Sequence, residues 1–471
     1  MVEDIKFLFV ISTAHDKDPA SEILFPLGAA YVASALKDVG VEVDVLNFDL
    51  DRNKAITPSE EIIDCIVKNK YDMVGIGFVA ARYNLIKDIL KAIRIGCNEV
   101  GAWMILGQHG PSAEPEFMLK ETGADFVVRG EGERAIKYLV KKRRSREPVE
   151  RIIDKQLIRD LDSISTPDWN VFSLEKYIVP STRLHYQQED KKTVSLITSR
   201  GCIGRCSFCF RIEKGYRTRS INHVLEEINI LHECYGVDFV NFYDEMIVAT
   251  EKRMKELCEG LSSLPFDLQW YAPSRVEICQ NIDNVKMMKD SGCTGLSIGF
   301  ESMDDGVLRR LRKMVTSEHN TIAIENCLKA GLPVGLNILW NLPGDTIESL
   351  WKNVDFIMKY SKWQECRTIK PVTPYPGCRL YYDAIRDGKL GGPKDFYERY
   401  TNLDRITVNF TDLSEDIMYE NLYEANCKLI DAFINNTDRS EVHYSLDGEG
   451  MKKEFYKLYF ENGYSEFRGV R

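Results

Sequence analysis

The sequence predicts an α/β protein in three parts: an N-terminal doubly wound, Rossmann-like domain, a partial (β/α)6 barrel of the TIM type, and a small helical C-terminal region. Two observations predict this order. Strand-like apolar runs alternate with helical stretches along most of the 471 residues, and a polar, proline-containing stretch interrupts the alternation once. We therefore divide the chain into domains at 1–143 and 191–380, a linker at 144–190 and a helical region at 381–471.

The first 143 residues predict a parallel sheet with helices on both faces. Expected strands lie at 5–12, 41–47, 71–78, 103–107 and 124–128. Expected helices lie at 26–37, 59–69, 83–95 and 113–122, and a last one begins near 134. Because short connections join the alternating elements, we expect a doubly wound sheet that binds ligands at the carboxyl ends of its strands.

From residue 193 the alternation resumes with longer units. Expected strands lie near 193–199, 238–243, 267–272, 294–299, 333–340 and 366–372. These units fit an incomplete barrel whose ligands bind at the carboxyl ends of the strands. After about residue 381 the pattern is helical and aromatic, which predicts either a cap over a substrate pocket or a small helical core. The aromatic residues there are Tyr456, Tyr459, Phe460, Tyr464 and Phe467.

Composition narrows the classes of function. The 62 Lys and Arg residues against 72 Asp and Glu residues give a formal net charge of −10, which disfavours general binding to nucleic acid or to an anionic membrane. No apolar run reaches the roughly 18–20 residues of a membrane span, and the N-terminal segment does not resemble a signal peptide. We expect a cytoplasmic protein without a membrane span.

The thirteen cysteines divide into ten that stand apart and three that cluster, Cys202, Cys206 and Cys209. An odd number spread along a long chain favours reduced thiols or metal ligands over a disulfide framework. The C-x3-C-x2-C spacing lies in a glycine-containing loop where the first barrel strand is expected to end. Three thiolates can hold a four-iron cluster and leave one iron open, whereas a zinc site would need a fourth, distant ligand.

The segment CIGRCSFC resembles the signature of the radical S-adenosylmethionine (SAM) superfamily, including the aromatic Phe208 before the last cysteine. Five later segments resemble family motifs in the same order: 242–245, 270–275, 297–302, 342–346 and 373–377. The resemblance implies a 4Fe-4S cluster on the three cysteines, SAM bound to the open iron, and reductive cleavage of SAM to methionine and a 5′-deoxyadenosyl radical. It also implies an electron donor such as a ferredoxin or flavodoxin.

The same resemblance implies which side chains contact SAM. They are Phe208, Asp244, Arg275, Ser297 and Glu301. Each polar member has a structural alternative, because the two acidic residues could cap helices after their strands and the arginine could serve as an ion-pair partner. Their expected place at the carboxyl ends of barrel strands, beside the cysteines, favours the SAM assignment.

Glycine-containing loops in the N-terminal part, together with the segment 124–133, resemble the cobalamin-binding domain that precedes many radical SAM domains. The stretch 161–172 also resembles the usual link between those two domains. The implied cobalamin contacts are Pro26, Leu27, Gly28, Gly77, Gly107, Gln108, His109 and Gly110. The cobalt-ligating DxHxxG motif of many cobalamin proteins has no match in residues 1–143, and His109 fits either the cobalamin periphery or a structural role in its loop.

The leading hypothesis is a cobalamin-dependent radical SAM methyltransferase acting on an unactivated carbon. In that scheme one SAM methylates cobalamin and a second supplies the radical that activates the substrate. An oxidative cyclase or ring-rearranging enzyme would share every motif, and product mass separates the two. A non-catalytic cobalamin or redox sensor is the remote alternative. The substrate remains open among small molecules, lipids, tetrapyrroles and peptides.

Overall fold

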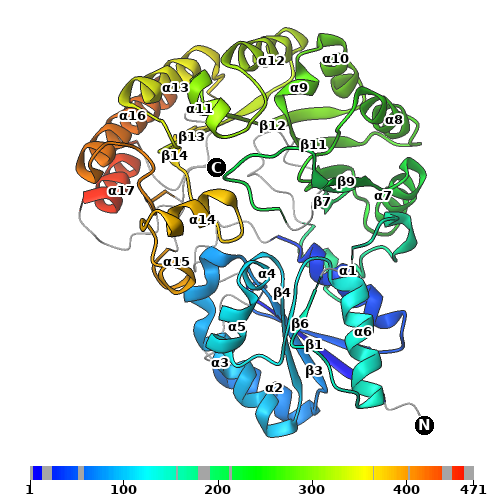
Figure 1. Ribbon diagram of the computed structural model, residues 1–471. Helices are drawn as coiled ribbons and strands as arrows, with labels where there is room; N and C mark the ends of the chain where they lie inside the picture. The colour runs from blue at the N-terminus through cyan, green and yellow to red at the C-terminus, as the bar shows by residue number, and fades with distance from the viewer. Residues whose placement is uncertain are drawn as a thin grey trace.

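The computed structural model describes residues 4–12, 24–50, 58–154, 157–178, 191–211, 215–363, 365–400, 404–436 and 448–460. The N-terminal part forms a β-sheet with helices packed on it, drawn in blue and cyan at the bottom of Figure 1. Above it, the green-to-yellow part curves into an open arc of strands with helices on its outer side (Figure 1). The predicted α/β class and the order of the parts are confirmed.

The first sheet is parallel, with the described strands in the order β2-β1-β3-β4-β5-β6. They are β1 (Lys6–Ile11), β2 (Glu42–Asn47), β3 (Met73–Gly77), β4 (Trp103–Gly107), β5 (Phe126–Val128) and β6 (Ile152–Ile153). Side chains alternate between two cores: Phe7 and Phe9 face one, and Leu8 and Val10 face the other. The sequence did not predict β6, because two residues in a polar linker carry no strand periodicity.

Helices cover both faces of this sheet. The core that contains Phe7 is covered by α1 (Leu27–Lys37) and α6 (Gly132–Ser145). The opposite core is covered by α2 (Pro58–Asn69), α3 (Tyr83–Val100) and α5 (Pro115–Thr122). The predicted helix at 113–122 corresponds to α5, which Pro115 opens as its first residue, and a short helix that was not predicted, α4 (His109–Ala113), precedes it. The doubly wound prediction is confirmed.

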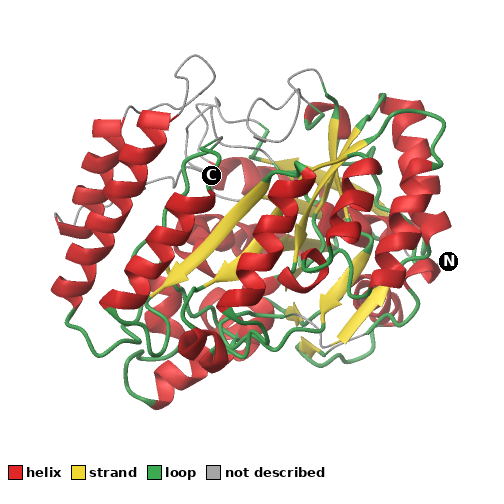
Figure 2. Ribbon diagram, turned by 90° about the horizontal axis from the view of Figure 1, so that it is seen from above, coloured by secondary structure: helices red, strands yellow, loops and turns green. Residues whose placement is uncertain are grey.

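The second sheet is also parallel, and its described strands follow the order β14-β13-β12-β11-β10-β7. They are β7 (Thr193–Leu196), β10 (Phe239–Phe242), β11 (Gln269–Ser274), β12 (Cys293–Glu301), β13 (Val334–Trp340) and β14 (Lys370–Pro371). The larger helices that alternate with them are α7 (Ile221–Tyr235), α8 (Glu251–Ser262), α10 (Ile282–Asp290), α12 (Ser317–Ala330) and α13 (Ile347–Tyr360). Seen from above in Figure 2, red helices flank the yellow strands. The partial barrel is confirmed.

The strand expected at 193–199 differs from the structure. The barrel strand β7 ends at Leu196, and the chain then forms a separate antiparallel hairpin from β8 (Ser199–Cys202) and β9 (Gly215–Thr218). The cysteine segment therefore follows β8 of this hairpin and not β7. A single apolar run had concealed two short strands with a turn between them.

The C-terminal part is helical, as predicted. Its helices are α14 (Arg379–Arg386), α15 (Pro393–Arg399), α16 (Glu415–Asn436) and α17 (Gly448–Phe460). Helix α16 packs on α13 and α17, and Tyr459 is buried there, so this region contains a helical core. Tyr464 and Phe467 lie outside the described residues. None of the helices in the described ranges is long and apolar enough to cross a membrane.

Candidate functional site

The three clustered cysteines occupy the end of β8 and the turn after it. The Cys209 N–H donates to the Cys206 carbonyl at 3.3 Å, and the Gly204 N–H donates to the Cys202 Sγ at 3.3 Å. A Cβ at Gly204 would stand 2.6 Å from Arg275 Nη1, so glycine is what lets the loop pack against that guanidinium. The turn therefore depends on Gly204 as well as on the cysteines.

The protein environment controls the charge of these thiols. Burial, together with the neighbouring Cys206, Glu245 and Cys202, raises the pKa of Cys209 to about 12. Burial also raises the pKa of Cys206, while the cations of Lys313 and Arg275 lower it. The raised pKa values of Cys206 and Cys209 keep these two thiols neutral near pH 7, and binding a metal would release their protons.

The donor set fits a 4Fe-4S cluster. Three soft thiols lie in one loop, within electrostatic reach of one another, and two cations flank them. Across the described ranges, no three or more His, Cys, Asp or Glu side chains are grouped as a site for one metal ion. The three ligands of a 4Fe-4S cluster need not converge on one point, because each ligand binds a different iron.

Glu301 ends β12 in an unusual backbone conformation. Its φ is +65°, and the register with β13 shifts between Gly299 and Glu301, which marks a bulge. The residue is 7% exposed, and its Oε1 accepts a hydrogen bond from Lys313 Nζ at 2.8 Å. Asp304 caps the next helix, α11 (Asp305–Arg310), so Glu301 is not the helix cap that the structural alternative required.

Lys313 is a site residue that sequence reasoning missed. Its side chain is only 6% exposed, and although burial lowers the pKa of its ammonium, the combined effect of Glu301 and Cys206 is a net rise. A lysine in an arginine-rich stretch after a helix carries no signal that it is buried. Only the tertiary structure reveals the ion pair beside Cys206.

Asp244 follows β10, and the structure assigns it a clear set of partners. Its carboxylate accepts from the Thr198 N–H at 3.0 and 3.1 Å, from the Thr198 hydroxyl at 3.0 Å and from the Ser199 hydroxyl. The residue is 3% exposed, and Thr250 caps the following helix α8. Asp244 is therefore not a helix cap, and in this structure it fixes the turn from β7 into the cysteine hairpin.

The remaining polar residues predicted for SAM lie on neighbouring strands. Arg275 pairs with Glu277 and donates from Nη2 to the Lys313 carbonyl at 3.2 Å, so it has a structural ion-pair partner and also adjoins the cysteine loop. Ser297 accepts from Asn337 Nδ2 at 2.8 Å. Asn337 Oδ1 in turn accepts from Arg367 Nη1 at 3.2 Å, which extends a polar network that the sequence did not indicate.

Two aromatic residues flank the last cysteine, and one of them, Phe210, reaches the N-terminal domain. Phe208 and Phe210 both pack against the apolar cluster that includes helix α3. The ring centroid of Phe210 lies 4.0 Å from that of His109, with the planes at 86°. Gly377 makes room for it, since a Cβ there would stand 2.3 Å from the Phe210 ring. The structure thus brings the cysteine loop and the predicted cobalamin loop into contact.

The predicted cobalamin loop after β4 is tightly constrained. Gln108 has a φ of +68°, and a Cβ at Gly110 would stand 2.8 Å from the Phe78 carbonyl oxygen. The Tyr397 hydroxyl donates to the Gly110 carbonyl at 2.7 Å. Gly77 lies under Gln108, with 3.2 Å between a built Cβ and the Gln108 Cβ. The loop is shaped by contacts from two separate parts of the chain, the end of β3 and α15.

Other glycines in this region border open space. A Cβ at Gly28 or Gly107 would meet nothing within 4 Å. Gly28 lies in the first turn of α1, after Pro26 and Leu27, and that turn has neither a side-chain cap nor an acidic residue. Backbone that faces open space at the ends of parallel strands fits a bulky ligand such as cobalamin.

His109 supports that fit. Burial lowers the pKa of its imidazole to about 4, so the ring is neutral at pH 7. Its Nδ1 is buried and has no hydrogen-bond partner among the described residues, while the ring lies between Phe210 and Tyr375. A buried polar nitrogen without a partner is costly, which favours a ligand that supplies one.

Comparisons with known proteins agree with this geometry. The B12 binding domain model matches residues 19–140, and the radical SAM superfamily model matches residues 196–357. The chain is a B12-binding radical SAM enzyme. Its cofactors are accordingly cobalamin, SAM and a 4Fe-4S cluster.

Relatives of this radical SAM enzyme differ in their named reactions. It is 28% identical over 403 residues to an uncharacterized methyltransferase of Pyrococcus horikoshii, covering 81% of this chain and 82% of that one. It is 27% identical over 347 residues to the anaerobic magnesium-protoporphyrin IX monomethyl ester cyclase of Rubrivivax gelatinosus, covering 69% of this chain and 60% of that one. OxsB, solved with aqua-cobalamin and SAM bound, shares the fold at a TM-score of 0.70 and 16% identity over 97% of this chain and 70% of that chain.

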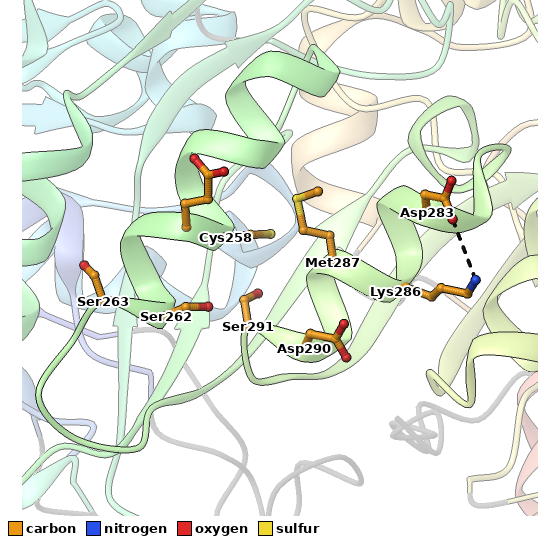
Figure 3. A pocket seen from close by; sticks show the side chains of 9 residues that line it. Cys258, Ser262, Ser263, Asp283, Lys286, Met287, Asp290 and Ser291 are labelled. Carbon is orange, nitrogen blue, oxygen red and sulfur yellow. Dashed lines mark ion pairs between the residues drawn. The ribbon is translucent and has the colours of Figure 1, made fainter.

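A separate groove of about 520 Å³ lies on the outside of the radical SAM domain, between α8 and α10 (Figure 3). Its lining includes Cys258, Met287 and Ser291, and Lys286 pairs with Asp283 at its rim at 3.7 Å. None of the residues predicted for the cofactors lines it. The groove is therefore not part of the cofactor site.

Proposed function

We propose that this radical SAM enzyme is a methyltransferase that acts on an unactivated carbon of a small-molecule substrate. The observation that carries the proposal is the contact between Phe210 and His109, which joins the cysteine loop to the predicted cobalamin loop. A methyl group can pass between two cofactors only if they border one cavity. The Pyrococcus methyltransferase, matched along 81% of this chain, supports the same reaction.

We assign the cluster ligands to Cys202, Cys206 and Cys209. When bound, the cofactors supply the electron transfer, radical generation and methyl transfer that amino-acid side chains cannot perform. Asp244 holds the turn into the cysteine hairpin through Thr198 and Ser199. We propose that these hydrogen bonds keep the three thiols in place.

We assign SAM to the surface formed by Phe208, Arg275, Ser297 and Glu301, with Asp244 acting through the hairpin. The ion pair of Glu301 with Lys313 places a carboxylate in a buried position, where it can accept from an ammonium or hydroxyl group. Arg275, which is paired with Glu277, adds a cation beside Gly204.

We assign cobalamin to the strand ends of the N-terminal domain. The contacting residues would be Pro26, Leu27, Gly28, Gly77, Gly107, Gln108, His109 and Gly110. His109 stays neutral because of its low pKa, and its Nδ1 can take part in a hydrogen bond with the ligand. We also propose that the domain boundaries lie at residues 143, 190 and 380.

The substrate class follows from chemistry shared with relatives. The Rubrivivax relative is named for a magnesium tetrapyrrole, so we propose a tetrapyrrole or a molecule of similar size. The cluster must receive an electron, for which we propose a ferredoxin or flavodoxin. All thirteen cysteines lie in the described ranges and none is in a disulfide, which supports a reducing, cytoplasmic setting.

Anaerobic turnover tests the proposal. Reconstituted enzyme is supplied with SAM, methylcobalamin, a reductant and tetrapyrrole precursors, and products are analysed by mass spectrometry. A methyltransferase adds fourteen mass units to the substrate, and methyl-labelled SAM passes its label to the product. The cyclase relative motivates the alternative of an oxidative cyclase, in which the product gains no methyl mass while 5′-deoxyadenosine still forms.

A further inference from the structure

The hairpin that carries Cys202 belongs to neither large sheet. Strands β8 and β9 form a two-stranded sheet of their own, so other contacts must set its place. Asp244 ties its first residues to the barrel. The opposite face of the hairpin is held by charged residues from the N-terminal domain.

Two arginines stand directly opposite each other on the hairpin. Arg200 on β8 is the register partner of Arg217 on β9. Like charges in such a pair repel, which makes a shared counter-charge necessary. Glu131, from the loop before α6, supplies it: its Oε1 lies 2.9 Å from Arg200 Nη1 and 2.9 Å from Arg217 Nη1.

A second carboxylate completes the arrangement. Glu133, in the first turn of α6, lies 2.5 Å from Arg200 Nη2. The Arg200 guanidinium also lies over the ring of Tyr31 on α1, 5.0 Å from its centroid. Arg200 thus contacts three side chains of the N-terminal domain, in the planar, two-pronged manner that suits a guanidinium.

Because its two carboxylates are buried, this network can adopt few alternative arrangements. Glu131 and Glu133 are only 7% and 5% exposed. Buried carboxylates are costly unless every oxygen has a partner, and a single misplaced donor would leave one unsatisfied. The second oxygen of Glu131 accepts from the Ile158 N–H at 2.7 Å and from Arg217 at 3.0 Å. The carboxylate therefore joins the N-terminal domain, the linker and the hairpin at one point.

We propose that Glu131 and Glu133 are positioning residues that lock the cysteine hairpin against the B12-binding domain and so fix the cluster relative to cobalamin. The inference rests on the proposed function for the identity of the two cofactors. Within the described residues, the two carboxylates bond to Arg200, Arg217 and the Ile158 N–H. They act through Arg200, two residues before Cys202 on the same strand.

The test uses holoenzyme with the cluster reduced and cobalamin as cob(II)alamin, both paramagnetic. Pulsed electron paramagnetic resonance measures their dipolar coupling without any substrate. In E131Q, iron and cobalamin contents should equal those of the wild type, while the narrow distance distribution of the wild type broadens. Calorimetry of the same samples should show one transition in the wild type and two in the variant, because the domains lose their coupling.

The matched control is D404N, which neutralises another buried carboxylate, in the C-terminal region, whose Oδ1 lies 2.8 Å from Lys370 Nζ of β14. It should lower the melting temperature and leave the distance distribution narrow. A narrow distribution in E131Q, or equal broadening in D404N, would overturn the proposal. Should E131Q not fold, Arg200→Lys gives the same comparison, since it keeps the charge but cannot bridge two carboxylates. If the wild-type enzyme transfers no methyl group, the proposed function is contradicted. The distance measurement would still test the positioning role of Glu131.

Discussion

Removal of a single hydroxyl group tests how the C-terminal region supports the predicted cobalamin loop. Tyr397 on α15 is fully buried, and its hydroxyl donates to the Gly110 carbonyl at 2.7 Å. Its ring also meets Tyr83 edge-on, with centroids 5.6 Å apart. The substitution Tyr397→Phe keeps the ring and removes only the donor, which leaves the carbonyl of the buried Gly110 without its partner.

An unsatisfied buried acceptor costs about 1–3 kcal/mol. If the loop loses its order in the variant, cobalamin binding must restore it, and the dissociation constant rises by about 5- to 150-fold. Titration of apoprotein with cobalamin, followed by absorbance, measures this change. Tyr400→Phe is the matched control, because its hydroxyl accepts from Arg399 at 2.7 Å and does not bond to the loop. Equal affinities in the two variants would refute the reasoning.

Three further predictions concern the site. Gly204→Ala forces a Cβ to within 2.6 Å of Arg275 Nη1, so iron content after reconstitution should fall well below that of the wild type. Glu301→Gln removes the partner of Lys313, which should weaken SAM binding in calorimetry by at least tenfold; unchanged affinity would remove Glu301 from the site. His109 has its pKa lowered by burial to about 4, against about 6.5 when unfolded, so the unfolded chain takes up the proton first. Apoprotein stability should therefore fall as pH drops from about 6.5 toward 4, by about 2 kcal/mol at pH 5, and His109→Gln should lose that part of the pH dependence in thermal melts.

Most of the fold could be predicted from the sequence, because strands and helices leave local patterns of apolar residues. Alternating apolar runs predicted the larger strands of both sheets, and helix α1 begins where Pro26 and the following glycine indicated. The two-residue strand β6 escaped notice because it pairs through backbone atoms alone. The hairpin after β7 escaped for a similar reason, since its strands contain arginines and glycines in place of apolar residues.

Several features of the site depend on contacts between segments that are far apart in the sequence, so the sequence alone did not predict them. The bulge at Glu301 depends on pairing with β13, and the burial of Lys313 depends on that bulge. Asp244 and Arg275 could be named from motifs, yet their partners are fixed only when strands converge. The C-terminal region was expected to cap a substrate or form a core, and α15 in addition braces the N-terminal domain through Tyr397.

The central claim is that Cys202, Cys206 and Cys209 hold the cluster that cleaves SAM beside cobalamin. Formation of 5′-deoxyadenosine by anaerobically reconstituted protein, with SAM and a strong reductant, tests it most directly. The wild type should form 5′-deoxyadenosine, and the variant with all three cysteines changed to alanine should form none while still binding cobalamin. Continued formation of 5′-deoxyadenosine by that variant would contradict the account.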